Sequence, residues 1–400
     1  MNFGNFFFRL NDPCYRSTMD LQPLPFRSPL IAYEQQAAVL LDGHRAGDPA
    51  AIDLFHGNHP QFLDEKIIWR RKFISASEIC DASLTLEDAR LALARSYGFL
   101  DWSALAAHVA AVTQDGPVHD FEAAVEAVVN GDLTTLEAAL RRNPTLIRAR
   151  STRICNLAPP VHGATLLHYV AANGVEGYRQ KTPPNAVAIA RALLTAGAEP
   201  DAEADLYGGG ATTMSLLVSS DHPARAGLSA PLVELLLDFG AEIEGRGVQE
   251  WAGPLFTALA FGKIAAAEAL ARRGACIQLA EAAGLGLEEK FMRLLPGADA
   301  GSRHRALALA AQYGHDAIVR ALLDAGEDLN RFNPPGTHGH STPLHQAALN
   351  GHEAVVQLLV ERGARLDLRD KVWLGTPLGW AEHGCQAHII QFLRSRGAVE

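Results

Sequence analysis

The sequence has few cysteines, and they are isolated from one another. No two of them are spaced like the paired ligands of a structural zinc site. An odd number of distant cysteines also does not make the disulfide framework of a small secreted domain. The five are Cys14, Cys80, Cys155, Cys276 and Cys385. We therefore expect a cytoplasmic protein without a metal site.

Long apolar runs and an excess of basic charge are also missing. No stretch approaches the ~20 apolar residues that a membrane-spanning helix needs. Lys and Arg number 35 against 45 Asp and Glu, for a formal net charge of −10. This balance lacks the basic footprint of a nucleic-acid-binding domain. We expect neither a membrane nor a nucleic acid among the partners.

Catalytic motifs are absent too. The sequence contains no Gly-x-Ser-x-Gly elbow, no His-Glu-x-x-His pair and no kinase-type set. Three glycines at 208–210 are not followed by the Lys-Ser/Thr of a phosphate-binding loop. His338 and His340 could hold a metal, but no third ligand stands at a fixed spacing. We predict no catalytic residue and no cofactor, and lean toward a protein that is not an enzyme.

What the sequence does contain is a repeated unit, clearest over residues 342–364. Thr342 is a good helix N-cap, and Pro343 suits the first helical position. Gly351 and Gly363 can adopt the left-handed conformation that ends a helix. The pattern predicts two short helices, which cannot bury their apolar faces without stacked copies on both sides.

Copies of this unit are present at 254–275, 307–326 and 376–398, and Leu344 and Leu378 lie 34 positions apart. The unit resembles the ankyrin repeat, whose period is ~33 residues and whose signature is T-P-L-H-x-A. The resemblance implies an all-α solenoid of paired helices with short finger hairpins. It also implies a protein-binding scaffold, and a hydrogen bond from the signature histidines, His168 and His345, to the loop backbone.

The region before the repeats predicts a small helical domain at 31–115. Its clearest part is a helix pair at 84–112, which resembles the N-terminal segment of a group of bacterial ankyrin repeat proteins. That resemblance implies a cap and not an activity. Residues 1–30 contain four prolines and predict an extended or disordered lead, in which either Met1 or Met19 could be the start. Residues 116–400 then form about eight repeat units, several of them degenerate.

Residues 33–63 and 121–147 share a second pattern. Each contains a Gly-Asp pair, which begins at Gly47 in the first segment and at Gly131 in the second. In each, a residue followed by proline, His59 or Asn143, lies 12 positions after that glycine. The two segments are either one degenerate unit used twice or two amphipathic hairpins that agree by coincidence. Between them, the basic run at 69–73 is either a solvated helix face or a site for a nucleic acid or an acidic partner.

One repeat contains an insert between its two helices. Gly351 and Gly363 are 12 positions apart, whereas the equivalent Gly174 and Gly197 are 23 apart. About 11 residues, 175–185, are therefore inserted.

The next repeat has an insert at the same place. Asp221 takes the position of Gly351, and Gly240 follows 19 residues later. The extra residues lie at 222–228. By contrast, the unit at 278–298 is too close to its predecessor for a finger hairpin, so we expect a bend or a gap in the row of fingers there.

Equivalent turns of adjacent repeats lie side by side, so the two inserts should meet. The polar residues that would come together are Tyr178, Arg179, Lys181, Ser219, Asp221, His222 and Arg225. They could brace one another, or bind a small polar or anionic ligand, or carry out acid–base chemistry through His222. These three interpretations stay open.

Three aromatic residues fall on predicted fingers, namely Trp251, Phe332 and Trp373. They are either contact points for a partner or packed on the next finger. Taken together, the sequence predicts a non-enzymatic scaffold of the bacterial cytoplasm that binds a protein partner on the concave repeat face. The alternative is a small-ligand-binding protein or an enzyme built on the two inserts.

Overall fold

A computed structural model describes residues 23–67, 69–245 and 252–399 of the chain. Within these ranges the regular elements are helices, together with three isolated β-bridges, so the predicted all-α class is confirmed. No helix in the described ranges is both long and apolar enough to cross a bilayer. The chain forms two compact units, an N-terminal unit up to Ala241 and a C-terminal unit from Glu242.

The N-terminal unit begins with a bundle of helices around one apolar core. The helices are α1 (Leu30–Arg45), α2 (Pro49–Asn58), α3 (Ala76–Cys80), α4 (Leu86–Ser96) and α5 (Trp102–Thr113), with a 3₁₀ turn η1 (Pro60–Phe62) after α2. Helix α4 packs on α1, α2 and α5. Phe55 and Leu93 are buried at the centre of this core. The Thr85 hydroxyl caps α4, as the sequence predicts, and Asp88 completes the capping box.

The paired segments predicted to be one unit used twice adopt matching conformations. The second copy consists of α6 (Pro117–Asn130), α7 (Leu133–Arg142) and η2 (Pro144–Arg148), which correspond to α1, α2 and η1. Gly47 and Gly131 are both left-handed, with φ of 72° and 75°. Asp48 and Asp132 each cap the following helix. The agreement in turn, cap and 3₁₀ element favours repetition over coincidence.

The basic run at 69–73 is neutralised within its own unit. Arg70 pairs with Asp64, and Arg71 pairs with Asp53. This pairing favours the interpretation of the run as an ordinary charged face.

The remainder of the N-terminal unit consists of stacked helix pairs. Its elements are α8 (Leu166–Val170), η3 (Gly177–Arg179), α9 (Ala186–Thr195), α10 (Thr213–Leu217), α11 (Asp221–Arg225) and α12 (Ser229–Asp238). First helices α6, α8 and α10 pack in one row, and α7, α9 and α12 pack in a second row. The two predicted inserts lie between the helices of their repeats and fold as η3 and α11. The N-terminal unit therefore joins the helical bundle and the first repeats, while the boundary near residue 115 stays a prediction.

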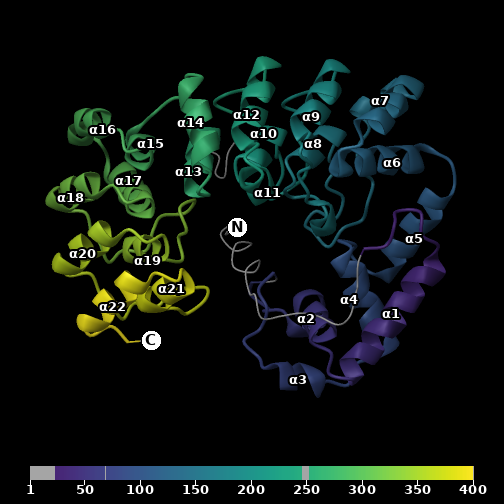
Figure 1. The fold of residues 1–400 in the computed structure, drawn as a ribbon, viewed down its shortest axis with the longest axis horizontal. Helices are drawn as coiled ribbons and strands as arrows, with labels where there is room; N and C mark the ends of the chain where they lie inside the picture. The colour runs from purple at the N-terminus through teal and green to yellow at the C-terminus, as the bar shows by residue number, and fades with distance from the viewer. Residues whose placement is uncertain (1–22, 68, 246–251, 400) are drawn as a thin grey trace. The chain divides into compact units, whose positions relative to one another are not determined.

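The C-terminal unit is a regular double row of helices. It contains α13 (Pro254–Ala260), α14 (Ile264–Arg272), α15 (Leu279–Gly284), α16 (Glu288–Leu294), η4 (Leu295–Gly297), α17 (Ala300–Tyr313), α18 (Asp316–Asp324), α19 (Pro343–Leu349), α20 (Glu353–Glu361), α21 (Pro377–His383) and α22 (Ala387–Ser395). Odd-numbered helices from α13 to α21 contact one another in order, and α16, α18, α20 and α22 form the second row (Figure 1). The pairs α13–α14, α19–α20 and α21–α22 each have seven and nine residues.

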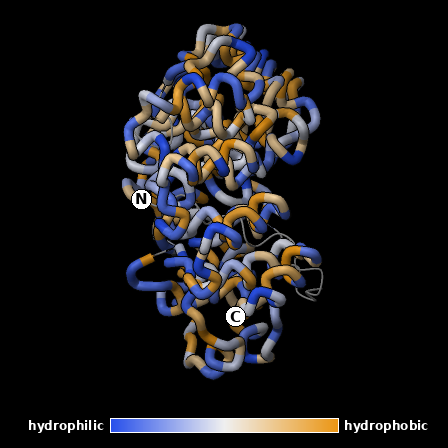
Figure 2. Tube along the Cα trace, turned by 90° about the vertical axis from the view of Figure 1, so that its left-hand side faces the viewer, coloured by the Kyte–Doolittle hydropathy of each residue, from blue (hydrophilic) through white to orange (hydrophobic). Residues whose placement is uncertain are grey.

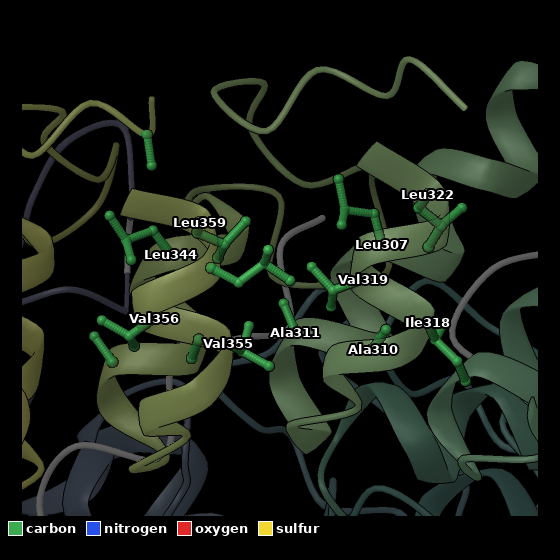
Figure 3. Close-up of a cluster of buried hydrophobic side chains, with 14 of the residues drawn as sticks. Leu307, Ala310, Ala311, Ile318, Val319, Leu322, Leu344, Val355, Val356 and Leu359 are labelled. Carbon is green, nitrogen blue, oxygen red and sulfur yellow. The ribbon is translucent and has the colours of Figure 1, made fainter. Parts of the chain in front are cut away.

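Apolar side chains from both rows meet in a continuous core. Leu307 of α17, Val319 of α18 and Leu344 of α19 face one another across the helix pairs, together with Val355 and Leu359 of α20 (Figure 3). Along the chain, hydrophobic and hydrophilic residues alternate within short distances, as expected for helices with one buried face (Figure 2).

Consecutive repeats are also joined by polar contacts at the end of each first helix. His315 Nε2 donates to Gly284 O at 3.2 Å, and His352 Nε2 donates to Gln312 O at 2.8 Å. Gln386 Nε2 donates to Leu349 O at 3.1 Å. We call these three contacts the inter-repeat hydrogen bonds. Each one satisfies a carbonyl that a helix end leaves without an intrahelical partner.

The inter-repeat hydrogen bonds require glycine at the preceding turn. Gly314 has φ +80°, and a Cβ added there would lie 2.5 Å from Nδ1 of His352. Gly286 and Gly351 have the same relation to His315 and Gln386, at 2.6 and 2.7 Å. A side chain at these turns would displace the group that caps the helix.

The unit predicted to lack a finger does lack one. Only four residues, 275–278, separate Gly274 from α15. Beyond α15, α17 reaches back to the end of α13, where Tyr313 Oη and Gln312 Nε2 donate to Leu259 O at 2.7 and 3.1 Å. The shortened repeat thus lets two non-consecutive repeats touch.

Replacing Gly314 by alanine should destabilise the C-terminal unit more than replacing Gly326. Both glycines have positive φ, but nothing lies within 4 Å of a Cβ at Gly326. Backbone strain of about 1–2 kcal/mol is common to both variants. Gly314→Ala should cost about 1–3 kcal/mol more, because its methyl group meets the His352 ring. Urea unfolding followed by circular dichroism measures the difference, and equal losses would contradict the proposed contact.

Candidate functional site

The finger hairpins of the repeats are held by the signature histidines. His345 Nδ1 accepts from Thr342 N at 3.2 Å, so Nε2 carries the proton and donates to Gly375 O at 3.2 Å. His168 does the same between Thr165 N and Ala211 O. Burial lowers the pKa of both rings to about 4. The predicted structural role is confirmed, and it fixes the neutral form of each ring.

A buried aspartate that sequence analysis missed shapes the finger at 368–375. Asp370 is 1% exposed. Its carboxylate accepts from the backbone N–H of Val372, Trp373 and Gly375 at 2.8, 2.6 and 2.8 Å. The indole of Trp380 on α21 donates to the same carboxylate at 3.1 Å. The hairpin is therefore rigid, and its one carboxylate faces inward. The only sequence signal was an aspartate six residues before Thr376.

The solvent-exposed part of this finger region consists of apolar and basic groups. Leu374 is 52% exposed, whereas Phe332 and Trp373 are half-buried. The Lys371 ammonium lies 4.1 Å from the centroid of the Phe332 ring, so two fingers are joined by a cation–π contact. Of the three aromatic residues singled out in the sequence, Phe332 and Trp373 lie here. Trp251 lies outside the described residues.

A comparison with protein families agrees with this geometry. The model of ankyrin repeats in three copies matches residues 279–370. The chain contains ankyrin repeats. No curated protein matches its sequence. The match covers α15 to the start of the finger at 368–375.

In the N-terminal unit, the first insert of the ankyrin repeats places Arg179 inside a buried charge cluster. Arg179 is 1% exposed, and its guanidinium contacts the carboxylates of Glu122 and Glu126 on α6 at 2.6 and 2.9 Å. A third carboxylate, Glu176, lies 3.8 Å away. Burial alone would lower the pKa of Arg179. Glu122 and the other negative groups raise it by more, so the pKa lies well above its usual value. The residue is therefore fully charged.

A second buried arginine extends this charge cluster to the N-terminal helical bundle. Arg153 lies 3.5 Å from Glu176 and donates to Tyr178 Oη at 3.0 Å. Its guanidinium also stacks 4.2 Å from the ring of Phe99, which follows α4. Burial would raise the pKa of Glu176, yet Arg153 and its other partners hold it below the usual range. The cluster thus fastens α4, α6 and the insert to one another.

The two inserts make their polar contacts with different parts of the unit. Arg225 pairs with Asp221 within α11 at 3.6 Å. Near the second insert, Asn173 donates to Ser219 Oγ at 2.8 Å, which links the adjacent turns. Lys181 is exposed. His222 is half-buried, and burial lowers its pKa. The ion pairs thus connect the first insert to α6 and Arg153.

Cys155, His162 and Glu176 deserve scrutiny as a metal or catalytic site, because one ligand atom of each lies within 4.8 Å of the others. However, His162 Nδ1 accepts from Ala164 N at 3.1 Å, and Nε2 lies 3.2 Å from a Glu176 oxygen. Both ring nitrogens of His162 thus have partners within the protein. Burial raises the pKa of Cys155 to about 12, which removes the thiolate that nucleophilic chemistry needs. These contacts and the buried thiol are consistent with a structural role.

Arg179→Ala should unfold the N-terminal unit far more readily than Arg225→Ala. Removing one partner of a buried ion pair leaves uncompensated charge and costs about 3–5 kcal/mol. Arg225 lies in the other insert, and its pair is half exposed, so its loss should cost less than about 1 kcal/mol. Hydrogen–deuterium exchange of the amides of α6 and α8 would show the difference. Similar protection in both variants would mean that the buried cluster contributes little.

The stability of the C-terminal unit should decrease as the pH is lowered from about 6.5 to about 4. The folded His345 ring stays neutral down to its lowered pKa of about 4, whereas the unfolded ring gains a proton near 6.5. The unfolded state thus binds more protons in this window, and His345 contributes a slope of about 1.4 kcal/mol per pH unit. Urea titrations at several pH values should show a slope reduced by that amount in His345→Gln. An unchanged slope would refute this assignment.

Proposed function

We propose that this ankyrin repeat protein is a non-enzymatic scaffold that binds a protein partner on the concave face formed by its first helices and fingers. Ankyrin repeats generally mediate protein–protein interaction. The observation that carries the proposal is the finger at 368–375. It holds an exposed leucine, Leu374, on a hairpin made rigid by the buried Asp370. A rigid apolar contact exposed to solvent is typical of a binding surface, because ordering it on association costs little entropy.

The chemistry of the inserts supports the same proposal over the pocket alternative. Arg179, the strongest anion-binding candidate from the sequence, has its charge taken up by Glu122, Glu126 and Glu176. Its side chain is buried, so it does not offer a donor to a ligand from solvent.

A cytoplasmic location, in a bacterium, belongs to this proposal as well. The described cysteines, Cys80, Cys155, Cys276 and Cys385, are free thiols, which fits a reducing compartment.

Leu374→Asn should reduce partner binding at least about tenfold, because it removes the exposed apolar contact. Asparagine tolerates the left-handed backbone at this position, where φ is 59°. The matched control is Leu294→Asn, another partly exposed leucine (37%), on the second-row helix α16. Proteins retained from native extract by immobilised wild-type chain would be quantified by mass spectrometry against both variants. A partner that is lost equally with both variants, or with neither, would contradict binding at the fingers.

A further inference from the structure

The finger surface combines its apolar residues with three exposed cations, namely Arg331, Arg369 and Lys371. Arg369 donates to Leu374 O at 2.7 Å, and Lys371 lies over the Phe332 ring. In the described part of the chain, none of the three has a carboxylate within ion-pair distance.

Three other exposed arginines of the same unit are paired, whereas Arg293, Arg320 and Arg396 are exposed without a carboxylate within ion-pair distance in the described residues. Arg362 lies 2.8 Å from Asp324, Arg365 lies 2.9 Å from Asp367, and Arg394 lies 2.7 Å from Glu382. The contrast matters because the whole chain is acidic, with a formal net charge of −10. Carboxylates are plentiful, yet none pairs with the cations on the fingers.

The acidic residues near these fingers have other partners. The Asp370 carboxylate is buried and bonded to four N–H groups. Asp328 accepts from the backbone N–H of Asn330 at 2.9 Å, and Asp367 is held by Arg365. The finger surface is therefore locally positive, with Leu374 and the edges of Phe332 and Trp373 among its cations.

From this pattern we infer that the partner presents an acidic segment with at least one apolar side chain, which docks on the finger surface of Arg331, Phe332, Arg369, Lys371, Trp373 and Leu374. The inference rests on the proposed scaffold function and specifies the chemistry of its partner. Carboxylates of the segment would pair with the three cations, and its apolar residue would cover Leu374. Such charge complementarity raises the association rate and selects against basic partners.

A protein segment fits this surface better than a nucleic acid does. Three cations on a chain of net charge −10 would neutralise only about three phosphates, which gives little affinity at physiological salt. The exposed leucine, moreover, has no counterpart to contact on a phosphate backbone.

The test is selection from a random peptide library displayed on phage, with the full-length protein as bait. We expect the selected peptides to be enriched in Asp and Glu together with Leu or Phe. The triple variant Arg331→Gln, Arg369→Gln, Lys371→Gln should lose the acidic enrichment and bind the selected peptides about tenfold more weakly, with a smaller dependence on salt. The matched control changes three exposed arginines that lie outside the fingers and have no such pair, Arg293, Arg320 and Arg396, to Gln and should retain both.

The possible failures are distinguishable. Neutral or basic peptides, no enrichment at all, or equal loss in both triple variants would overturn the inference. So would single-stranded RNA that competes with the selected peptides at equal concentration. In each of these cases the scaffold function would still stand if a cellular partner is lost specifically with Leu374→Asn. If Leu374→Asn retains every partner, the proposed function itself fails.

Discussion

The C-terminal unit depends on closing the ends of its first helices with groups from later repeats. A helix of seven residues leaves most of its carbonyls without intrahelical partners, and packing alone does not satisfy them. His315, His352 and Gln386 supply donors at equivalent positions. Because each donor belongs to the next repeat, no repeat is complete by itself. This is the physical reason why the apolar core in Figure 3 is continuous and why stability is shared between neighbours.

In the N-terminal unit, a buried cluster of ion pairs joins the irregular repeat to its neighbours. There the first insert buries Arg179 and Glu176 beside Glu122 and Arg153, at a large cost in hydration. Apolar residues of similar volume would join α4, α6 and the insert without this loss of hydration, but they would not specify the relative orientation of these elements. Charges of alternating sign accept only one register, so we interpret the cluster as a specificity device. It joins the bundle helix α4 to α6 through Phe99 and Arg153.

The regular parts of the fold were predictable because the signals were local. Thr342, Pro343 and Gly351 specify a cap, a start and a stop, and the structure places each of them as predicted. The missing finger near 278 followed from counting residues. The environment of Arg179 did not follow, because repeat periodicity locates a turn but not the direction of a side chain in an irregular insert. Glu122 gave no warning either, since a lone glutamate on an amphipathic helix is usually exposed.

Strongly shifted pKa values often mark active sites, but only where a cleft gives a substrate access to them. In this chain the shifted groups of the N-terminal cluster, Glu176 and Arg179 among them, are buried and neutralise one another. The finger surface shows the reverse condition, since Arg331, Arg369 and Lys371 are exposed and form no ion pair with the described residues. Charges that are paired with one another inside the protein contribute to its structure. Charge that is left unpaired on an exposed surface is available to another molecule, and this difference is the reason for proposing that the fingers bind the partner.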